Sequence, residues 1–297
     1  MTYTRKLCLF VLGLSAALWS LWPIYSLLRV SLETPSELSA IPMHFVPLTP
    51  MFGSYLRMVG FSTQVFGQME GPIGVWRYYL EGLVNSAIVA SATTILSLFF
   101  SFLAGYAFAR YRFRLKGALL GLLLFSRTLP PIVMLIPYLA FFSVVHLNGT
   151  LLGLTLTYLV LSVPFVTWVL IGFFGSLPKD VENAARVDGC SRVSALTKVI
   201  LPLSAPGIAS VGVIAWLMAW NEFIFALLLV GGTPATTVPP VLEAIFVGGS
   251  FPSLDLFSVY SSGVMISIIP AIIVSCVFQR YITRLKIVDP GAGTLGQ

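Results

Sequence analysis

Long, nearly unbroken runs of apolar residues dominate this chain, and the charged residues gather in the short stretches between them. Six runs are long enough to cross a membrane as helices, since about 20 apolar residues span the hydrocarbon core. The pattern therefore predicts an all-α, polytopic membrane protein with six transmembrane helices in a single transmembrane domain over residues 1–297. The runs cover residues 7–29, 84–109, 117–144, 150–174, 204–230 and 258–280.

The basic residues predict the orientation of these helices. They cluster before the first run and after the second, fourth and sixth, whereas the connections after the third and fifth runs contain neither Lys nor Arg. Because cytoplasmic loops collect Lys and Arg, we expect a multi-pass protein with both termini in the cytoplasm. The clusters are Arg5 and Lys6; Arg110, Arg112, Arg114 and Lys116; Lys179, Arg186, Arg192 and Lys198; and Arg280, Arg284 and Lys286.

Composition supports a membrane protein and argues against other classes. Only 9% of the residues are charged, against about 25% in soluble domains. The net charge of +6 does not indicate nucleic-acid binding, because the basic residues lie where the membrane topology needs them. Three cysteines, Cys8, Cys190 and Cys276, are too scattered to indicate a disulfide framework. The first apolar run is too long for the core of a signal peptide, so we expect an uncleaved span.

The segment from residue 31 to residue 82 differs from the other connections. It is rich in proline, glutamate and aromatic residues, and it is long for a loop, which favours a functional or partly helical segment. The charge pattern places it outside the cytoplasm. We interpret it as a docking surface for an external partner, with a simple spacer as the alternative.

The most informative polar stretch is residues 176–202, SLPKDVENAARVDGCSRVSALTKVILP. Pro178 suits the first turn of a helix, where its missing N–H is not needed. Gly189 is a helix stop, and Pro202 is expected to end a second short helix. We call this stretch the two-helix segment, and expect it to lie in the cytoplasm between the fourth and fifth spans.

The two-helix segment is amphipathic and contains small residues. Glu182 and Arg186 are four residues apart and can pair on the first helix. Small side chains let another protein approach closely, so the pattern favours a helix held in a partner's groove. A helix lying in the lipid headgroups is the alternative, but such helices usually carry bulky apolar residues. The apolar stripes are Val181, Ala184 and Ala185 on the first helix and Val193, Leu196 and Ile200 on the second.

An arginine lies within the third apolar run. Arg127 is costly in lipid and should face the protein interior or a watery path. The prolines that follow, Pro130, Pro131 and Pro137, should break or kink this helix. Two interpretations stay open: Arg127 lines a translocation path, or it pairs structurally with a helix end or with Glu222.

A polar and aromatic cluster lies in the fifth run. Trp220, Asn221 and Glu222 are consecutive. An aromatic face beside hydrogen-bonding groups suits sugar rings, which present both C–H faces and hydroxyls. The alternative is that Trp220 and Asn221 pack against a neighbouring helix.

The two-helix segment resembles the EAA loop of membrane permeases of ABC importers, whose pattern is Glu-Ala-Ala, three residues, Gly, nine residues, Ile, one residue and Leu-Pro. Asn183 stands where the family usually has Glu, and Val199 stands for Ile. Glu182, one residue earlier, is a candidate for the missing carboxylate. The matching residues are Ala184, Ala185, Gly189, Leu201 and Pro202.

The resemblance extends over residues 5–286. GYAFARYRFR, LPPIVMLIPYL, GFFGSLPKDVENAARVDG and AWNEFIFALLL are similar, in order and spacing, to stretches of carbohydrate-uptake permeases of the maltose-transporter type. The resemblance implies two sets of site residues. The ATPase-coupling residues are Glu182, Asn183, Ala184, Ala185, Asp188, Gly189, Leu201 and Pro202, and the candidate path residues are Arg127, Trp220, Asn221 and Glu222.

The resemblance also implies partners and a location. Such a permease sits in the bacterial cytoplasmic (inner) membrane and pairs with a second, homologous permease, with a heterodimer expected. It works with two nucleotide-binding ATPase subunits and a periplasmic or extracellular solute-binding protein. The substrate implied is a sugar, with an oligosaccharide favoured and, because of Arg127, an acidic sugar as an alternative.

The chain itself is expected to bind no cofactor or metal and to have no catalytic residues. It lacks the G-x-x-x-x-G-K-[ST] motif, so ATP and Mg are expected on the partner ATPase. An ion-gradient-driven secondary transporter is the main alternative, because broken helices mark that class. An intramembrane enzyme lacks its motifs here, and hydropathy does not distinguish a channel or scaffold. ATP dependence would separate these functions.

Overall fold

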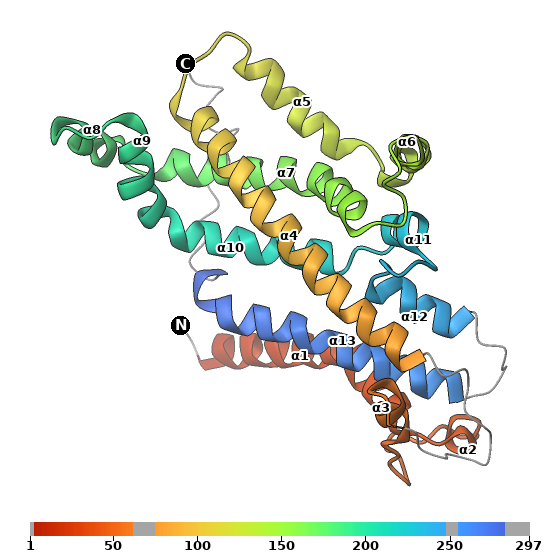
Figure 1. Ribbon diagram of the computed structural model, residues 1–297. Coiled ribbons are helices and arrows are strands. Elements are labelled where there is room, and N and C mark those ends of the chain that lie inside the picture. Colours follow the sequence, from red (N-terminus) through yellow and green to blue (C-terminus); the bar gives the residue numbers. More distant parts are fainter. Residues whose placement is uncertain (1–2, 62–74, 248–254, 283–297) are drawn as a thin grey trace. The chain divides into compact units, whose positions relative to one another are not determined.

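The computed structural model describes residues 3–61, 75–247 and 255–282, and every regular element in these ranges is a helix (Figure 1). The predicted all-α fold class is therefore confirmed. The helices are α1 (Tyr3–Leu32), α2 (Pro35–Leu38), α3 (Gly53–Met58), α4 (Val75–Arg110), α5 (Lys116–Thr128), α6 (Pro131–Val144), α7 (Leu151–Ser176), α8 (Lys179–Val187), α9 (Arg192–Ala195), the π-helical turn η1 (Leu196–Ile200), α10 (Leu201–Trp220), α11 (Ile224–Val230), α12 (Val238–Val247) and α13 (Asp255–Ile282).

Within these ranges, five helices are long and apolar enough to cross a membrane, and a bent pair supplies a sixth candidate. The pair is α5 and α6, which meet at an angle of 99°. Pro130 precedes α6 and has no N–H to continue α5, so the predicted break of the third run is confirmed. Pro137 lies inside α6 without ending it.

The prediction that the fifth run forms one unbroken helix is wrong. The fifth run was expected to be one span over residues 204–230, but α10 ends at Trp220 and α11 begins at Ile224. At its other end the same helix extends back through η1 to Arg192. Helix α4 begins at Val75, within the segment 31–82 that is expected outside the membrane. Residues 62–74 of that segment, and the basic residues Arg284 and Lys286, lie outside the described residues.

The described residues belong to two compact units. The first contains the described parts of residues 1–83 and 240–269. Its helices are tied by polar contacts at the end of α1: Arg29 Nε lies 3.1 Å from Glu33 Oε1, and Ser258 Oγ donates to the Glu33 carbonyl at 3.0 Å. Tyr79, which is fully buried, donates its hydroxyl to the carbonyl of Gly263 at 2.6 Å.

The second unit contains the described parts of residues 84–239 and 270–297. Helices α7 and α10 pack side by side in it (Figure 1). One apolar core lies where α4, α7 and α10 meet, and a second lies around α11. The first core contains Tyr106, Val166, Val169, Leu170, Phe174, Ile200, Val211 and Ala215.

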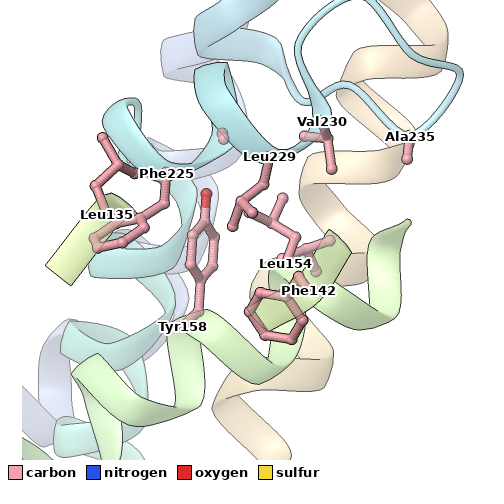
Figure 2. Packing of buried hydrophobic residues seen from close by; sticks show 10 residues of the cluster. Leu135, Phe142, Leu154, Tyr158, Phe225, Leu229, Val230 and Ala235 are labelled. Carbon is pink, nitrogen blue, oxygen red and sulfur yellow. The ribbon is translucent and has the colours of Figure 1, made fainter. Parts of the chain in front are cut away.

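The second core surrounds the tyrosine ring of Tyr158. Figure 2 shows this ring between Phe225 and Leu229 of α11. Leu154 and Phe142 close the other side of the cluster. Helix α11 is therefore held against α7 and α6 by packing, although it has only seven residues.

The ring of Phe173 on α7 lies close against Gly207 of α10. A Cβ built at this position would lie 2.5 Å from Cε2 and 2.6 Å from Cζ of Phe173. We predict that Gly207→Ala pushes the partly buried Phe173 ring out of its position and lowers the free energy of unfolding by about 1–3 kcal/mol. Gly175→Ala is the matched control, because a Cβ there meets nothing within 4 Å. Thermal unfolding of both variants in the same detergent checks this, and equal stability would contradict it.

Candidate functional site

The first helix of the two-helix segment is α8, and it ends as the sequence indicates. Pro178 lies one residue before the helix begins, with φ −58°. Gly189 has φ +87°, a conformation that glycine adopts without strain. Its N–H bonds to the carbonyl of Arg186 at 3.2 Å, and Cys190 N–H bonds to Ala185 at 3.0 Å. These two bonds form a Schellman motif, so the predicted stop at Gly189 is confirmed.

The second helix begins at Ser191, whose hydroxyl accepts a hydrogen bond from the N–H of Ser194 at 3.2 Å. Pro202 was predicted to end this helix, and that prediction is wrong, since the helix continues to Trp220. The reason is the π turn η1, in which Leu201 N–H donates to Leu196, five residues earlier. A widened turn leaves room for the ring of Pro202, which would otherwise clash with the preceding turn.

The carboxylate of Glu182 points inward, toward α4. Its Oε1 accepts a hydrogen bond from the Tyr106 hydroxyl at 2.6 Å, and its Oε2 lies 3.5 Å from Nε of Arg110. Arg110 also donates to the carbonyl of Leu177 at 3.1 Å. The Arg110 side chain is only 5% exposed and that of Glu182 16%. The ion pair predicted between Glu182 and Arg186 is therefore replaced by a buried pair that ties α8 to α4.

The two-helix segment has an inward and an outward face. Ala185, Ala195 and Ile200 are buried. Two valines stand out on the outward face, because Val187 is 87% exposed and Val193 is 70% exposed. The predicted apolar stripes are thus divided between the faces. The other expected coupling residues on the outward face are Asn183, Ala184, Asp188, Gly189, Leu201 and Pro202.

A second cationic contact steadies α9. The guanidinium of Arg192 lies 5.5 Å from the centre of the Tyr111 ring, and Tyr111 packs edge-on against Tyr106. Tyr111 follows α4 directly, so both short helices of the segment are attached to the end of α4. These contacts hold the segment from its inward side. Its outward face remains exposed on this chain.

Arg127 lies on α5 and contacts α7. Its guanidinium lies 5.0 Å from the centre of the Phe165 ring, and Nη1 donates to the carbonyl of Leu161 at 3.4 Å. The residue is exposed on this chain. Of the two interpretations left open, pairing with Glu222 is not observed in the described part of the chain.

Glu222 lies in the break between α10 and α11. Its two carboxylate oxygens accept the N–H groups of Phe225 at 3.0 Å and Ala226 at 3.1 Å. Oε2 also accepts the hydroxyl of Tyr158 at 2.8 Å. A carboxylate that binds the free N–H groups of a helix start stabilises that start. Glu222 therefore caps α11, which explains why the fifth run is interrupted.

Trp220 is packed within the chain. It is 5% exposed and stacks on Trp216 with ring centres 4.7 Å apart. The indole N–H of Trp216 donates to the hydroxyl of Ser91 at 3.4 Å. Asn221 is exposed and donates to the carbonyl of Leu217 at 2.8 Å. The packing interpretation of Trp220 fits these contacts, and Asn221 alone of the pair presents a polar group.

Sequence reasoning missed the partners of these carboxylates. Arg110 was recognised only as part of a basic cluster, and Tyr106 and Tyr158 gave no signal, because each lies 60 or more residues from the carboxylate it binds. Among the described residues, no group of three or more His, Cys, Asp or Glu side chains is arranged to hold a metal ion.

Comparison with known proteins shows the family to which this chain is similar. Residues 97–287 match the family described as binding-protein-dependent transport system inner membrane component. The sulfoquinovosyl glycerol transport system permease protein SmoH of Agrobacterium fabrum is 34% identical over 273 residues, covering 92% of this chain and 86% of the relative. The trehalose transport system permease protein SugB of Mycobacterium tuberculosis is 30% identical, covering 95% and 94%.

A solved structure shares the fold. It is a bacterial ABC transporter involved in the import of the acidic polysaccharide alginate, with a TM-score of 0.74 and 18% identity. The match covers 95% of this chain and 98% of that one. The likeness in fold therefore extends over nearly the whole chain.

Proposed function

This chain belongs to the family of binding-protein-dependent transport system inner membrane components, and we propose that it is the permease subunit of an ABC importer for a sugar. The observation that carries the proposal is the outward face of the two-helix segment, which the chain fixes to α4 through Glu182 but does not itself cover. The relatives named for sulfoquinovosyl glycerol and trehalose support a sugar or sugar glycoside as the substrate.

The proposed coupling site is the outward face of α8 and α9. Ala184 and Val187 present a small apolar surface that a groove on an ATPase subunit can enclose. Asn183 is exposed there in place of the usual glutamate, and offers an amide rather than a charge. Glu182 acts indirectly in this proposal, because its carboxylate fixes α8 to α4 and lets movement of the segment pass into a spanning helix.

The complex that this requires has several members: a second homologous permease, two ATPase subunits that hold ATP and Mg, and an extracytoplasmic solute-binding protein. Closure of the ATPase pair moves both two-helix segments, and the permease pair changes from an inward-facing to an outward-facing state. Coupling requires that each state binds the partners differently. The proposed location is the inner membrane, with both termini and the two-helix segment in the cytoplasm.

A test of this function separates ATP-driven import from an ion-gradient mechanism. The assembled transporter in proteoliposomes should accumulate labelled oligosaccharide only with enclosed ATP and added solute-binding protein. An ionophore that collapses ion gradients should leave the uptake unchanged. Uptake that needs the gradient and ignores ATP would overturn the proposal in favour of a secondary transporter.

Arg127 is the candidate determinant for an acidic sugar. Its guanidinium is exposed on this chain and is held by Phe165, so it can meet a carboxylate or sulfonate. We predict that Arg127→Ala lowers uptake of an acidic sugar at least tenfold, because an ionic hydrogen bond contributes about 1.5–3 kcal/mol. Neutral sugars should be little affected. Uptake of matched acidic and neutral oligosaccharides checks this, and Arg127→Lys is the control that keeps the charge. Equal losses for both sugars would contradict the assignment.

A further inference from the structure

An apolar loop, residues 39–52, folds back along the last two turns of α1. The hydroxyl of Tyr25 donates to the carbonyl of Phe45, and Nη1 of Arg29 donates to the carbonyl of His44 at 3.0 Å. Tyr25 and Arg29 are four residues apart, which is about one helical turn. Residues 44 and 45 of the loop therefore lie beside the last two turns of α1.

Polar contacts hold the second end of the loop. Oε1 of Glu37 accepts the N–H of Thr49 at 2.9 Å and its hydroxyl at 2.8 Å. Burial acts to raise the pKa of Glu37, but the hydrogen bonds from Thr49 and Thr34 outweigh it and hold that pKa below its ordinary value. Further along, Met51 N–H donates to the carbonyl of Leu32 at 2.9 Å. The loop is thus held in one position by its own framework.

This fixed loop displays large apolar side chains. The sequence from residue 39 to residue 56 contains no Asp, Glu, Lys or Arg. Several large exposed apolar side chains close together in the sequence indicate a site of interaction rather than a surface that faces water. The exposed fractions are 98% for Ile41, 64% for Met43, 68% for Phe45, 66% for Val46 and 67% for Leu48.

The position of the loop along α1 indicates what covers it. The apolar run of α1 begins at Leu7, and a hydrocarbon core of about 30 Å takes about 20 residues at 1.5 Å each. The membrane boundary then crosses α1 near residue 27, between the two residues that hold the loop. Trp19 and Trp22 are 84% and 55% exposed just before this level. Exposed tryptophans of this kind form the aromatic belt of membrane interfaces.

We propose that residues 41–48 are an interfacial anchor, which inserts Phe45 and its apolar neighbours into the boundary between lipid headgroups and acyl chains. Lipid is the occupant that the chemistry favours. Acyl chains need no polar partner, and the loop offers no charged group, whereas the rim of a protein interface is polar. The anchor would fix the end of α1 at the interface, which goes beyond the transport function and does not depend on it.

Spin labelling of the assembled transporter in proteoliposomes tests the proposal. Cys8, Cys190 and Cys276 are first replaced by serine, and a nitroxide is attached through Phe45→Cys. Collisions of the nitroxide with oxygen, which enters lipid, and with a water-soluble nickel chelate are then measured. The control is Ser36→Cys, on an exposed residue of α2 beyond the end of α1.

The proposal predicts that the label at Phe45 collides often with oxygen and rarely with the nickel chelate. The label at Ser36 should collide often with the nickel chelate. Equal nickel collisions at both positions would overturn it. A loss at Phe45 only after adding solute-binding protein would assign the loop to protein docking instead. Shielding from both reagents would assign it to the partner permease. If Phe45→Cys does not assemble, Val46→Cys, also well exposed, gives the same readout.

Discussion

Replacing Glu182 with glutamine is expected to loosen the two-helix segment from the rest of the chain. The variant keeps a hydrogen bond to Tyr106 but removes the negative charge beside Arg110, whose side chain is 5% exposed. Removing one partner of a buried ion pair usually costs 3–5 kcal/mol, and the partial exposure of Glu182 reduces our expectation to ~2–3 kcal/mol. Thermal unfolding in detergent measures the loss.

Two further variants separate the ion pair from other effects. Asp180→Asn removes a carboxylate from the same turn of α8, but Asp180 is exposed, so little change is expected. The double variant Glu182→Gln, Arg110→Gln should lose less free energy of unfolding than the two single variants lose together, because it leaves no unpaired charge. If Glu182→Gln is as stable as Asp180→Asn, the pair does not anchor the segment.

Val187→Asp is expected to separate the permease from its ATPase without unfolding it. Val187 is 87% exposed, so the carboxylate is solvated in the isolated chain and its stability should be unchanged. In the proposed groove the same carboxylate would be buried without a partner, which costs several kcal/mol. Since 1.4 kcal/mol is a factor of ten, we expect binding of the ATPase to weaken at least tenfold, measured by co-purification and by titration of the reconstituted complex.

The matched control is Val59→Asp. Val59 follows α3, is 41% exposed, and lies in the segment expected on the other side of the membrane. It should leave ATPase binding unchanged. Wild-type binding by Val187→Asp would remove the outward face of α8 from the docking surface, even if the chain is a permease.

The spans could be predicted because membrane helices show directly in the apolar runs. The first, second, fourth and sixth runs each correspond to a single helix, namely α1, α4, α7 and α13. The fifth run misled because long apolar stretches lie on both sides of Asn221 and Glu222, so hydropathy alone did not indicate a break there. Glu222 was visible in the sequence, but its action as a helix cap depends on the N–H groups of Phe225 and Ala226, which a continuous helix would have used.

The candidate coupling segment was found for a different reason. Its glycine stop and its small residues are local features, and Gly189 has the conformation that they predict. The sequence did not reveal the contacts between residues that are far apart along the chain. The inward turn of Glu182 depends on α4, which lies about 70 residues away, and the continuation past Pro202 depends on a widened turn.

ATP hydrolysis by the reconstituted complex tests the central claim most directly. The complex should be assayed with and without the solute-binding protein, against a panel of neutral and acidic oligosaccharides. We predict low basal hydrolysis that rises when the binding protein and one class of sugar are present together, which would also name that class. If no ATPase co-purifies with the chain and no sugar stimulates hydrolysis, the coupling role of the two-helix segment is contradicted.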